Sequence, residues 1–95
     1  MKLLRVEPLY GDIKKYRAVF EENGRTRSTK FGAAGMDDYT LTHDKAQREQ
    51  YRTRHQKNLK TGNPTMAGYL SYHLLWGDST SLRVNIAAYK RRFNL

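Results

Sequence analysis

The feature that most constrains this 95-residue sequence is a stretch at residues 69–76, where apolar and aromatic side chains are denser than anywhere else. Two of its leucines are spaced four apart, as on one face of a helix, and aromatic side chains fill the flanks. Pro64 suits a first helical turn, and Gly77 suits the position after the last one. We therefore expect a central helix over about 64–76 that needs contacts on several sides.

The strongest turn pattern in the chain is Asn23-Gly24, which follows a segment of alternating apolar and polar residues. Both positions of a two-residue type I′ hairpin turn require positive φ, which Asn and Gly tolerate. A turn at this point pairs Tyr16 with Phe31 on an apolar face and Arg17 with Lys30 on a basic face. We expect the apolar face of this hairpin to lie on the central helix.

A short apolar segment before Pro8 predicts one more strand, so the region of about 2–31 is expected to form an antiparallel β-hairpin or a three-stranded sheet. A polar helix is expected over about 43–59. Its weak docking stripe consists of Ala46, Gln50, Tyr51, His55 and Leu59. A last helix, over about 81–93, has a regular apolar row that consists of Leu82, Ile86, Tyr89 and Phe93. The sequence therefore predicts a single α+β domain over residues 1–95.

The charge balance indicates the kind of partner that the protein meets. Lys and Arg number 18 against 9 Asp and Glu, and the resulting net charge of +9 is typical of proteins that bind polyanions. There is no cysteine, which excludes disulfides and thiolate metal sites. No apolar run is long enough to cross a bilayer, so we expect neither a signal peptide nor a membrane partner.

Catalysis is the least supported interpretation. Asp37, Asp38, His43 and Asp44 offer the groups that a divalent metal needs, but their spacing fits no ligand pattern. The Gly-Ala-Ala-Gly segment at 32–35 lacks the Lys-Ser/Thr ending of a phosphate-binding loop. We expect no enzymatic activity, no catalytic residue, no metal and no cofactor.

The leading hypothesis is binding of DNA through its phosphates with low sequence specificity, with RNA as the alternative nucleic acid. Basic side chains are expected on the outer hairpin face, on the polar helix and in the last helix. The candidate contacts are Lys15, Arg17, Lys30, Arg48, Arg52, Arg54, Lys57, Lys90, Arg91 and Arg92. Two structural alternatives stay open: the hairpin face is simply solvated, or the final basic run stabilises the C-terminus of its helix.

Six segments of the sequence form a recognisable set: Phe31-Gly32-Ala33-Ala34-Gly35, Asp38-Tyr39-Thr40, Tyr51 to His55, Pro64-Thr65-Met66-Ala67-Gly68, Leu75-Trp76 and Tyr89-Lys90-Arg91-Arg92-Phe93. In their order and spacing they resemble a family of small basic proteins encoded by large DNA viruses of eukaryotes, the giant viruses. The resemblance spans about residues 13–95 and departs from the family at Leu59-Lys60-Thr61-Gly62. It implies a viral setting, in a virion or in the cytoplasm or nucleus of a host cell, and it transfers no catalytic residue.

The competing hypothesis is a protein-interaction module, either a homodimer or a component that joins a larger virion protein. A helix that is apolar on several sides in a short chain motivates it, since a small core leaves part of such a surface for a partner. Trp76, at the end of the central helix, is the aromatic residue whose exposure distinguishes core from interface.

Overall fold

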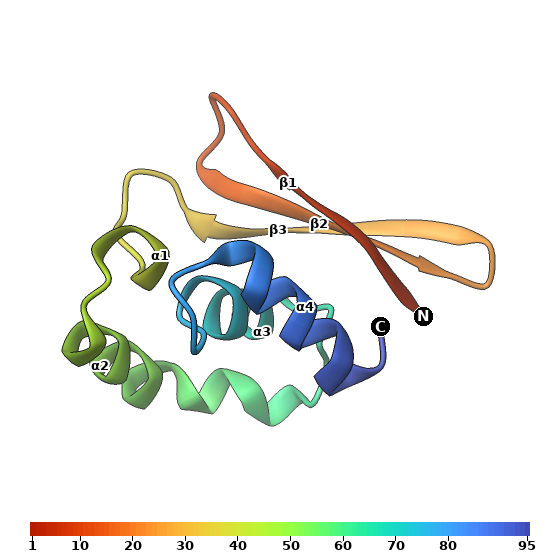
Figure 1. Cartoon of the computed structure of the whole chain (residues 1–95). Coiled ribbons are helices and arrows are strands. Elements are labelled where there is room, and N and C mark those ends of the chain that lie inside the picture. Colours follow the sequence, from red (N-terminus) through yellow and green to blue (C-terminus); the bar gives the residue numbers. More distant parts are fainter.

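The computed structural model describes residues 1–95 and contains one three-stranded antiparallel sheet with every helix on the same side of it (Figure 1). The strand order is β1-β2-β3, with β1 at Lys2–Pro8, β2 at Lys14–Glu22 and β3 at Arg25–Ala33. The α+β prediction is confirmed, and of its two versions of the sheet the three-stranded one is correct.

The β2–β3 hairpin closes at the predicted turn and in the predicted register. Asn23 and Gly24 have φ of 54° and 77°, as a type I′ turn requires. Tyr16 lies opposite Phe31, and Arg17 lies opposite Lys30. The closed end of this hairpin extends beyond the helices (Figure 1). A strong local turn is therefore sufficient to align nine-residue strands.

Strand β1 adds to the free side of β2, with an irregularity in the register between Leu3 and Arg5. Leu3 is 2% exposed, whereas the extra residue, Leu4, is 41% exposed. A bulge of this kind turns one side chain away from the core.

The polar helix expected over about 43–59 is present, and the structure divides it into two segments that begin and end two residues later than expected. A short helix, α1, occupies Tyr39–Thr42 and ends at His43, which has a left-handed φ of 57°. Helix α2 begins anew at Lys45–His55, because the Asp44 side chain accepts a hydrogen bond from the backbone N–H of Gln47 at 3.1 Å. The chain then tightens into η1, a 3₁₀ helix at Gln56–Thr61.

The central helix is shorter than the expected 64–76. It consists of α3 at Ala67–Leu70, followed by η2, one turn of π-helix at Ser71–Leu75. Pro64 lies in a preceding turn, in which the Asn63 carboxamide oxygen accepts hydrogen bonds from Thr65. The last helix, α4, occupies Leu82–Phe93 and agrees with the prediction within one residue. None of these helices has both the length and the apolar character that crossing a bilayer requires.

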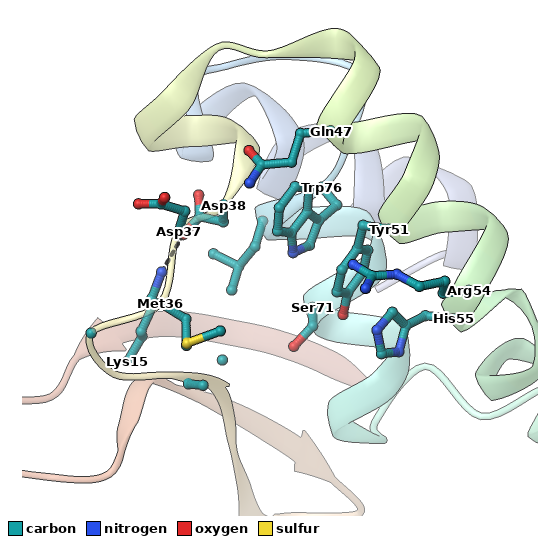
Figure 2. A pocket seen from close by; sticks show the side chains of 14 residues that line it. Lys15, Met36, Asp37, Asp38, Gln47, Tyr51, Arg54, His55, Ser71 and Trp76 are labelled. Carbon is teal, nitrogen blue, oxygen red and sulfur yellow. Dashed lines mark hydrogen bonds and ion pairs between the residues drawn. The ribbon is translucent and has the colours of Figure 1, made fainter.

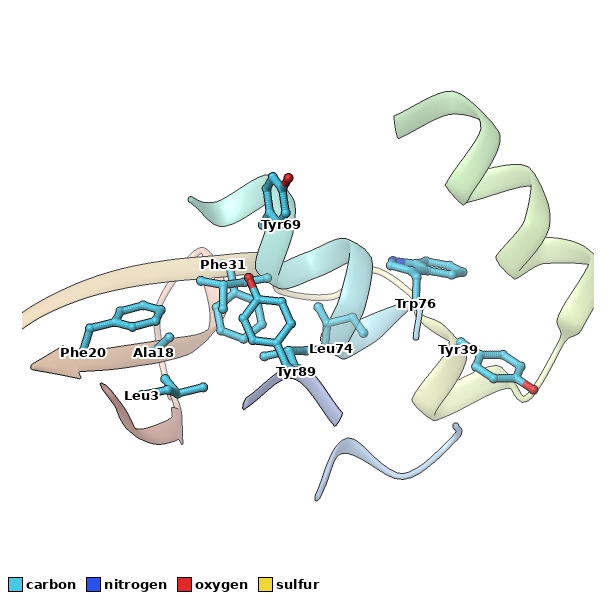
Figure 3. Packing of buried hydrophobic residues seen from close by; sticks show 11 residues of the cluster. Leu3, Ala18, Phe20, Phe31, Tyr39, Tyr69, Leu74, Trp76 and Tyr89 are labelled. Atoms are coloured by element: carbon cyan, nitrogen blue, oxygen red, sulfur yellow. The ribbon is translucent and has the colours of Figure 1, made fainter. Parts of the chain in front are cut away.

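The core lies between the sheet and α4, around the central helix (Figure 3). Leu70 and Leu74 are fully covered, and Trp76 is only 7% exposed, so the aromatic stretch is core and not an open patch. The buried apolar cluster consists of Leu3, Ala18, Phe20, Phe31, Tyr39, Tyr69, Leu70, Leu74, Leu75, Trp76 and Tyr89. The predicted cover of the central helix by the hairpin and the last helix is confirmed.

Candidate binding cleft and exposed basic face

A cleft of about 580 Å³ lies between one end of the sheet and helix α2 (Figure 2). Lys15, Gly32 and Met36 line it on the sheet side. Tyr51 and Trp76 line it on the helical side. Its volume lies within the range of small-molecule sites, which is about 300 to 1,000 Å³.

Three stacked rings form the helical wall of this cleft. Tyr51 stacks on Trp76 with ring centroids 4.3 Å apart, and His55 stacks on Tyr51 at 4.1 Å. Burial raises the pKa of the Tyr51 hydroxyl. Burial, followed by the nearby charges of Arg54 and Lys57, lowers the pKa of the His55 imidazole. Tyr51 is thus a neutral ring at physiological pH, and the stack attaches α2 to the core.

The indole N–H of Trp76 points into the cleft and donates to no protein atom (Figure 2). The backbone of the same residue is satisfied, since its N–H donates to Ser71 and its carbonyl accepts from Arg52. Every fully buried side-chain polar atom in the structure has a partner, so this free nitrogen must face open space. An indole N–H is a donor only, and it favours a ligand that carries an acceptor.

Lys15, one of the predicted phosphate contacts, already has a carboxylate partner within the protein. Its ammonium group lies 2.6 Å from the carboxylate of Asp38, and its side chain is 14% exposed. Asp38 is itself buried and accepts a hydrogen bond from the backbone N–H of Thr40 at the start of α1. This ion pair links strand β2 to the start of α1. The buried Asp38 carboxylate requires such a partner, because an unpaired charge is costly away from water.

Helix capping accounts for two of the carboxylates that the sequence offered as metal ligands. Asp38 caps α1 and Asp44 caps α2, so both have structural roles. No group of three or more acidic, histidine or cysteine side chains in the structure is placed to hold a metal ion.

The outer face of the hairpin is also less basic than the sequence suggests. Arg17 donates to the Glu7 carboxylate at 3.0 Å, and Lys30 donates to Asp12 at 2.7 Å. The hydrogen bond from Arg17, with one from Arg5, lowers the pKa of Glu7, and the bond from Lys30 lowers the pKa of Asp12. The like charges of Arg17 and Lys30 are therefore compensated within the sheet.

Arg48 and Arg52, two further predicted contacts, lie on the side of α2 that docks on the rest of the protein. The Arg52 guanidinium donates to the Trp76 carbonyl at 2.8 Å and to Asp78 at 3.0 Å. Arg48 lies over the Tyr39 ring at 4.8 Å from its centroid. In the predicted stripe, by contrast, Ala46 and Gln50 are exposed. The arginine stems and head groups replace the apolar residues that α2 lacks.

Five of the predicted contacts remain exposed and have no carboxylate partner: Arg54, Lys57, Lys90, Arg91 and Arg92. Lys60, which sequence reasoning left in a loop, shares their exposure and lines one shallow hollow with Arg54 and Lys57. The sequence signal for including Lys60 was its position three residues after Lys57, because residues i and i+3 lie on the same side of a 3₁₀ helix. We call these six side chains the basic face.

The two halves of the basic face are neighbours in space. The last turn of α4 lies beside η1 (Figure 1), and Arg92 lines a groove of about 370 Å³ together with Gln56 and Leu59. His73 lies in the same groove. Burial, with the charges of Arg92 and Arg52, lowers the pKa of its imidazole to about 4. This groove therefore has neutral aromatic walls and a cationic rim.

The fold, the cleft and the basic face define a small basic α+β domain with a mixed polar and aromatic site. The chain belongs to DUF5754, a family of unknown function, which matches residues 4–55. The matched part contains the sheet, α1 and α2 and so supplies residues of both walls of the cleft. No curated protein and no solved structure matches the chain.

Proposed function

We propose that this protein is a non-enzymatic nucleic-acid-binding protein that contacts DNA phosphates with low sequence specificity, with RNA as the alternative ligand. The observation that carries the proposal is the distribution of unpaired charge. Six of the 18 Lys and Arg side chains pair with carboxylates, which leaves twelve without a partner. Half of these twelve form the basic face.

The unpaired side chains of the basic face favour contacts to phosphates over contacts to the edges of bases. The basic face consists of long, exposed side chains without carboxylate partners to fix their head groups, whereas reading a base requires a fixed bidentate group. Neutralising phosphates releases counterions, and this release supplies most of the affinity in sequence-independent binding. The resemblance to proteins of large DNA viruses suggests the setting that we include in the proposal, a virion or the interior of a host cell.

The test is a salt titration of binding to mixed-sequence DNA with two charge-matched variants. One variant combines Arg54→Gln, Lys57→Gln and Lys60→Gln. The control combines Lys2→Gln, Arg25→Gln and Arg27→Gln, which lie at the far end of the sheet and also lack carboxylate partners. Both variants lose three positive charges. We expect the first to reduce the slope of log affinity against log salt by about 2 to 3, and the control to change it little.

Equal losses in the two variants would show that net charge alone, and not the basic face, drives binding. No binding of the unmodified protein at low salt would overturn the proposal itself.

A second candidate function is self-association, with a virion protein as the alternative partner. Tyr10 and Ile13 in the β1–β2 turn are 89% and 82% exposed, and Met36 beyond β3 is 63% exposed. The backbone N–H of Ala34 donates to the Ile13 carbonyl, which holds the two segments side by side. Large exposed apolar side chains that lie together favour a protein contact. Sedimentation of the protein and of Ile13→Lys at increasing concentration tests it, since a dimer lost in the variant supports this surface.

A further inference from the structure

We propose that the cleft beside α2 receives one unstacked base of a single strand whose backbone lies on the basic face. The inference rests on the proposed function and deepens it, because it names the form of nucleic acid that the protein prefers. It predicts a preference for single-stranded over double-stranded ligand, which the basic face alone does not.

The walls of the cleft suit a flat heteroaromatic ring. Tyr51 lines one side and the thioether of Met36 lines the other (Figure 2), and Leu75 also contributes to the lining. Trp76 and His55 cover the two faces of the Tyr51 ring, so a base in the cleft meets the edge of that ring and packs on Met36 and Leu75. Neutral aromatic and sulfur-containing side chains pack on bases of any type, so such a pocket binds without sequence preference. The hollow of about 580 Å³ is not filled by side chains.

The polar groups of the cleft have hydrogen-bonding capacity left for a ligand. The indole N–H of Trp76 faces the open cleft without a protein acceptor, and the carbonyl oxygens and ring nitrogens of bases are acceptors. The Gln47 carboxamide oxygen accepts from the Thr42 hydroxyl at 2.9 Å, which leaves its amino group free. Asp37 is exposed and forms no ion pair, so the same wall also offers acceptors to an exocyclic amino group.

Arg54 connects the cleft to the basic face. Its side chain lines the cleft with His55, and it also lines the outer hollow with Lys57 and Lys60. It has no carboxylate partner. A phosphate held by Arg54 therefore sits at the mouth of the cleft, from which the attached base reaches the Trp76 N–H. A paired base is unavailable there unless its duplex opens, and opening costs a few kcal/mol.

The experiment compares three DNA probes of equal phosphate number: a mixed-sequence single strand, a duplex of half its length, and an abasic single strand of the same length as the first. Binding is followed by anisotropy of a label on the DNA and by the fluorescence of Trp76, the only tryptophan in the chain. We expect the single strand to bind about tenfold more tightly than either other probe, because one stacked base contributes that much. We expect only the single strand to change the Trp76 emission.

Two matched variants separate the cleft from general charge effects. Met36→Glu places a carboxylate at the cleft, and Leu41→Glu makes the same change at a residue that is equally exposed (63% and 64%) but does not line it. We expect Met36→Glu to weaken single-strand binding about fivefold more than Leu41→Glu, with equal effects on duplex binding.

The outcomes distinguish the two proposals. If the abasic strand binds as tightly as the normal strand and Trp76 emission does not respond, the inference is overturned and phosphate binding stands. If none of the three probes binds at low salt, both proposals are overturned.

Discussion

Asn85 is the buried polar residue on which the end of the central helix depends. It is 4% exposed, and its side-chain amino group donates to the carbonyls of Leu74 at 3.0 Å and Ser79 at 2.8 Å. Its oxygen accepts from the Ser79 backbone N–H at 3.0 Å. The side chain thus satisfies three backbone groups that the end of η2 and the loop before α4 would otherwise leave without partners.

We predict that Asn85→Leu lowers the free energy of unfolding by about 2 to 4 kcal/mol, because it preserves size but removes these bonds. Urea denaturation measures the loss. Arg83→Ala, an exposed change two residues earlier on α4, should stay within about 0.5 kcal/mol of the unmodified protein. A loss below 1 kcal/mol in Asn85→Leu would show that water replaces the bonds.

His73 makes stability depend on pH. Rings of Tyr69, Tyr72, Tyr89 and Phe93 surround its imidazole. Arg92 from α4 and Arg52 from α2 oppose its protonation, whereas Asp78 favours it, and burial is the largest cause of its lowered pKa of about 4.

In the unfolded chain this imidazole binds a proton near pH 6.5, whereas in the folded protein it does so only near pH 4. The unfolded state therefore holds more protons in this window, and the His73 contribution is present above pH 6.5 and lost as the pH falls toward 4. Because the ring is only partly buried, we predict a loss of about 1 kcal/mol between pH 7.5 and 5.0. Denaturation at the two pH values should show a smaller loss in His73→Phe than in His43→Asn, which keeps the left-handed backbone at residue 43.

At the scale of elements, α2 is held to the molecule by few contacts. It has no fully buried residue, and the Tyr51 ring on Trp76 is its main apolar contact. We predict that Tyr51→Ala lowers the free energy of unfolding by about 2 kcal/mol. It should also speed hydrogen exchange of α2 amides more than that of β2 amides, because α2 then opens on its own. The exposed change Gln50→Ala should alter neither quantity, and uniform acceleration in Tyr51→Ala would instead indicate global unfolding.

The hairpin and the helices differ in how far sequence predicts them. A two-residue turn fixes strand register by itself, so every predicted β2–β3 pair is correct. The position of a helix end depends on a single capping hydrogen bond, and several neighbouring side chains compete to form that bond. The Thr42 hydroxyl donates to the Gln47 side chain, whereas the Asp44 carboxylate caps α2 by accepting from the Gln47 backbone N–H. Helix α2 therefore begins at Lys45 and not at the expected residue 43.

At the scale of the whole molecule, unbalanced charge opposes folding. Twelve cations but only four carboxylates lack an ion-pair partner, so repulsion outweighs the attraction that remains. We predict that raising sodium chloride from 20 to 200 mM increases the melting temperature by about 2 to 4 °C. Scanning calorimetry measures it, and the variant Arg54→Gln, Lys57→Gln, Lys60→Gln should show a smaller rise. A melting temperature that falls with salt would mean that the ion pairs dominate.

The sequence by itself determined the α+β class, the hairpin register, the aromatic core stretch and the excess of positive charge. These properties follow from composition and from interactions between residues that are close along the chain. Only the tertiary structure decided which basic side chains have partners within the protein and which do not. Lys15 meets Asp38 from 23 positions away, and Arg52 meets the Trp76 carbonyl from 24. The cleft and its free indole N–H likewise exist only after packing, because surfaces from the sheet, α2 and η2 form them together.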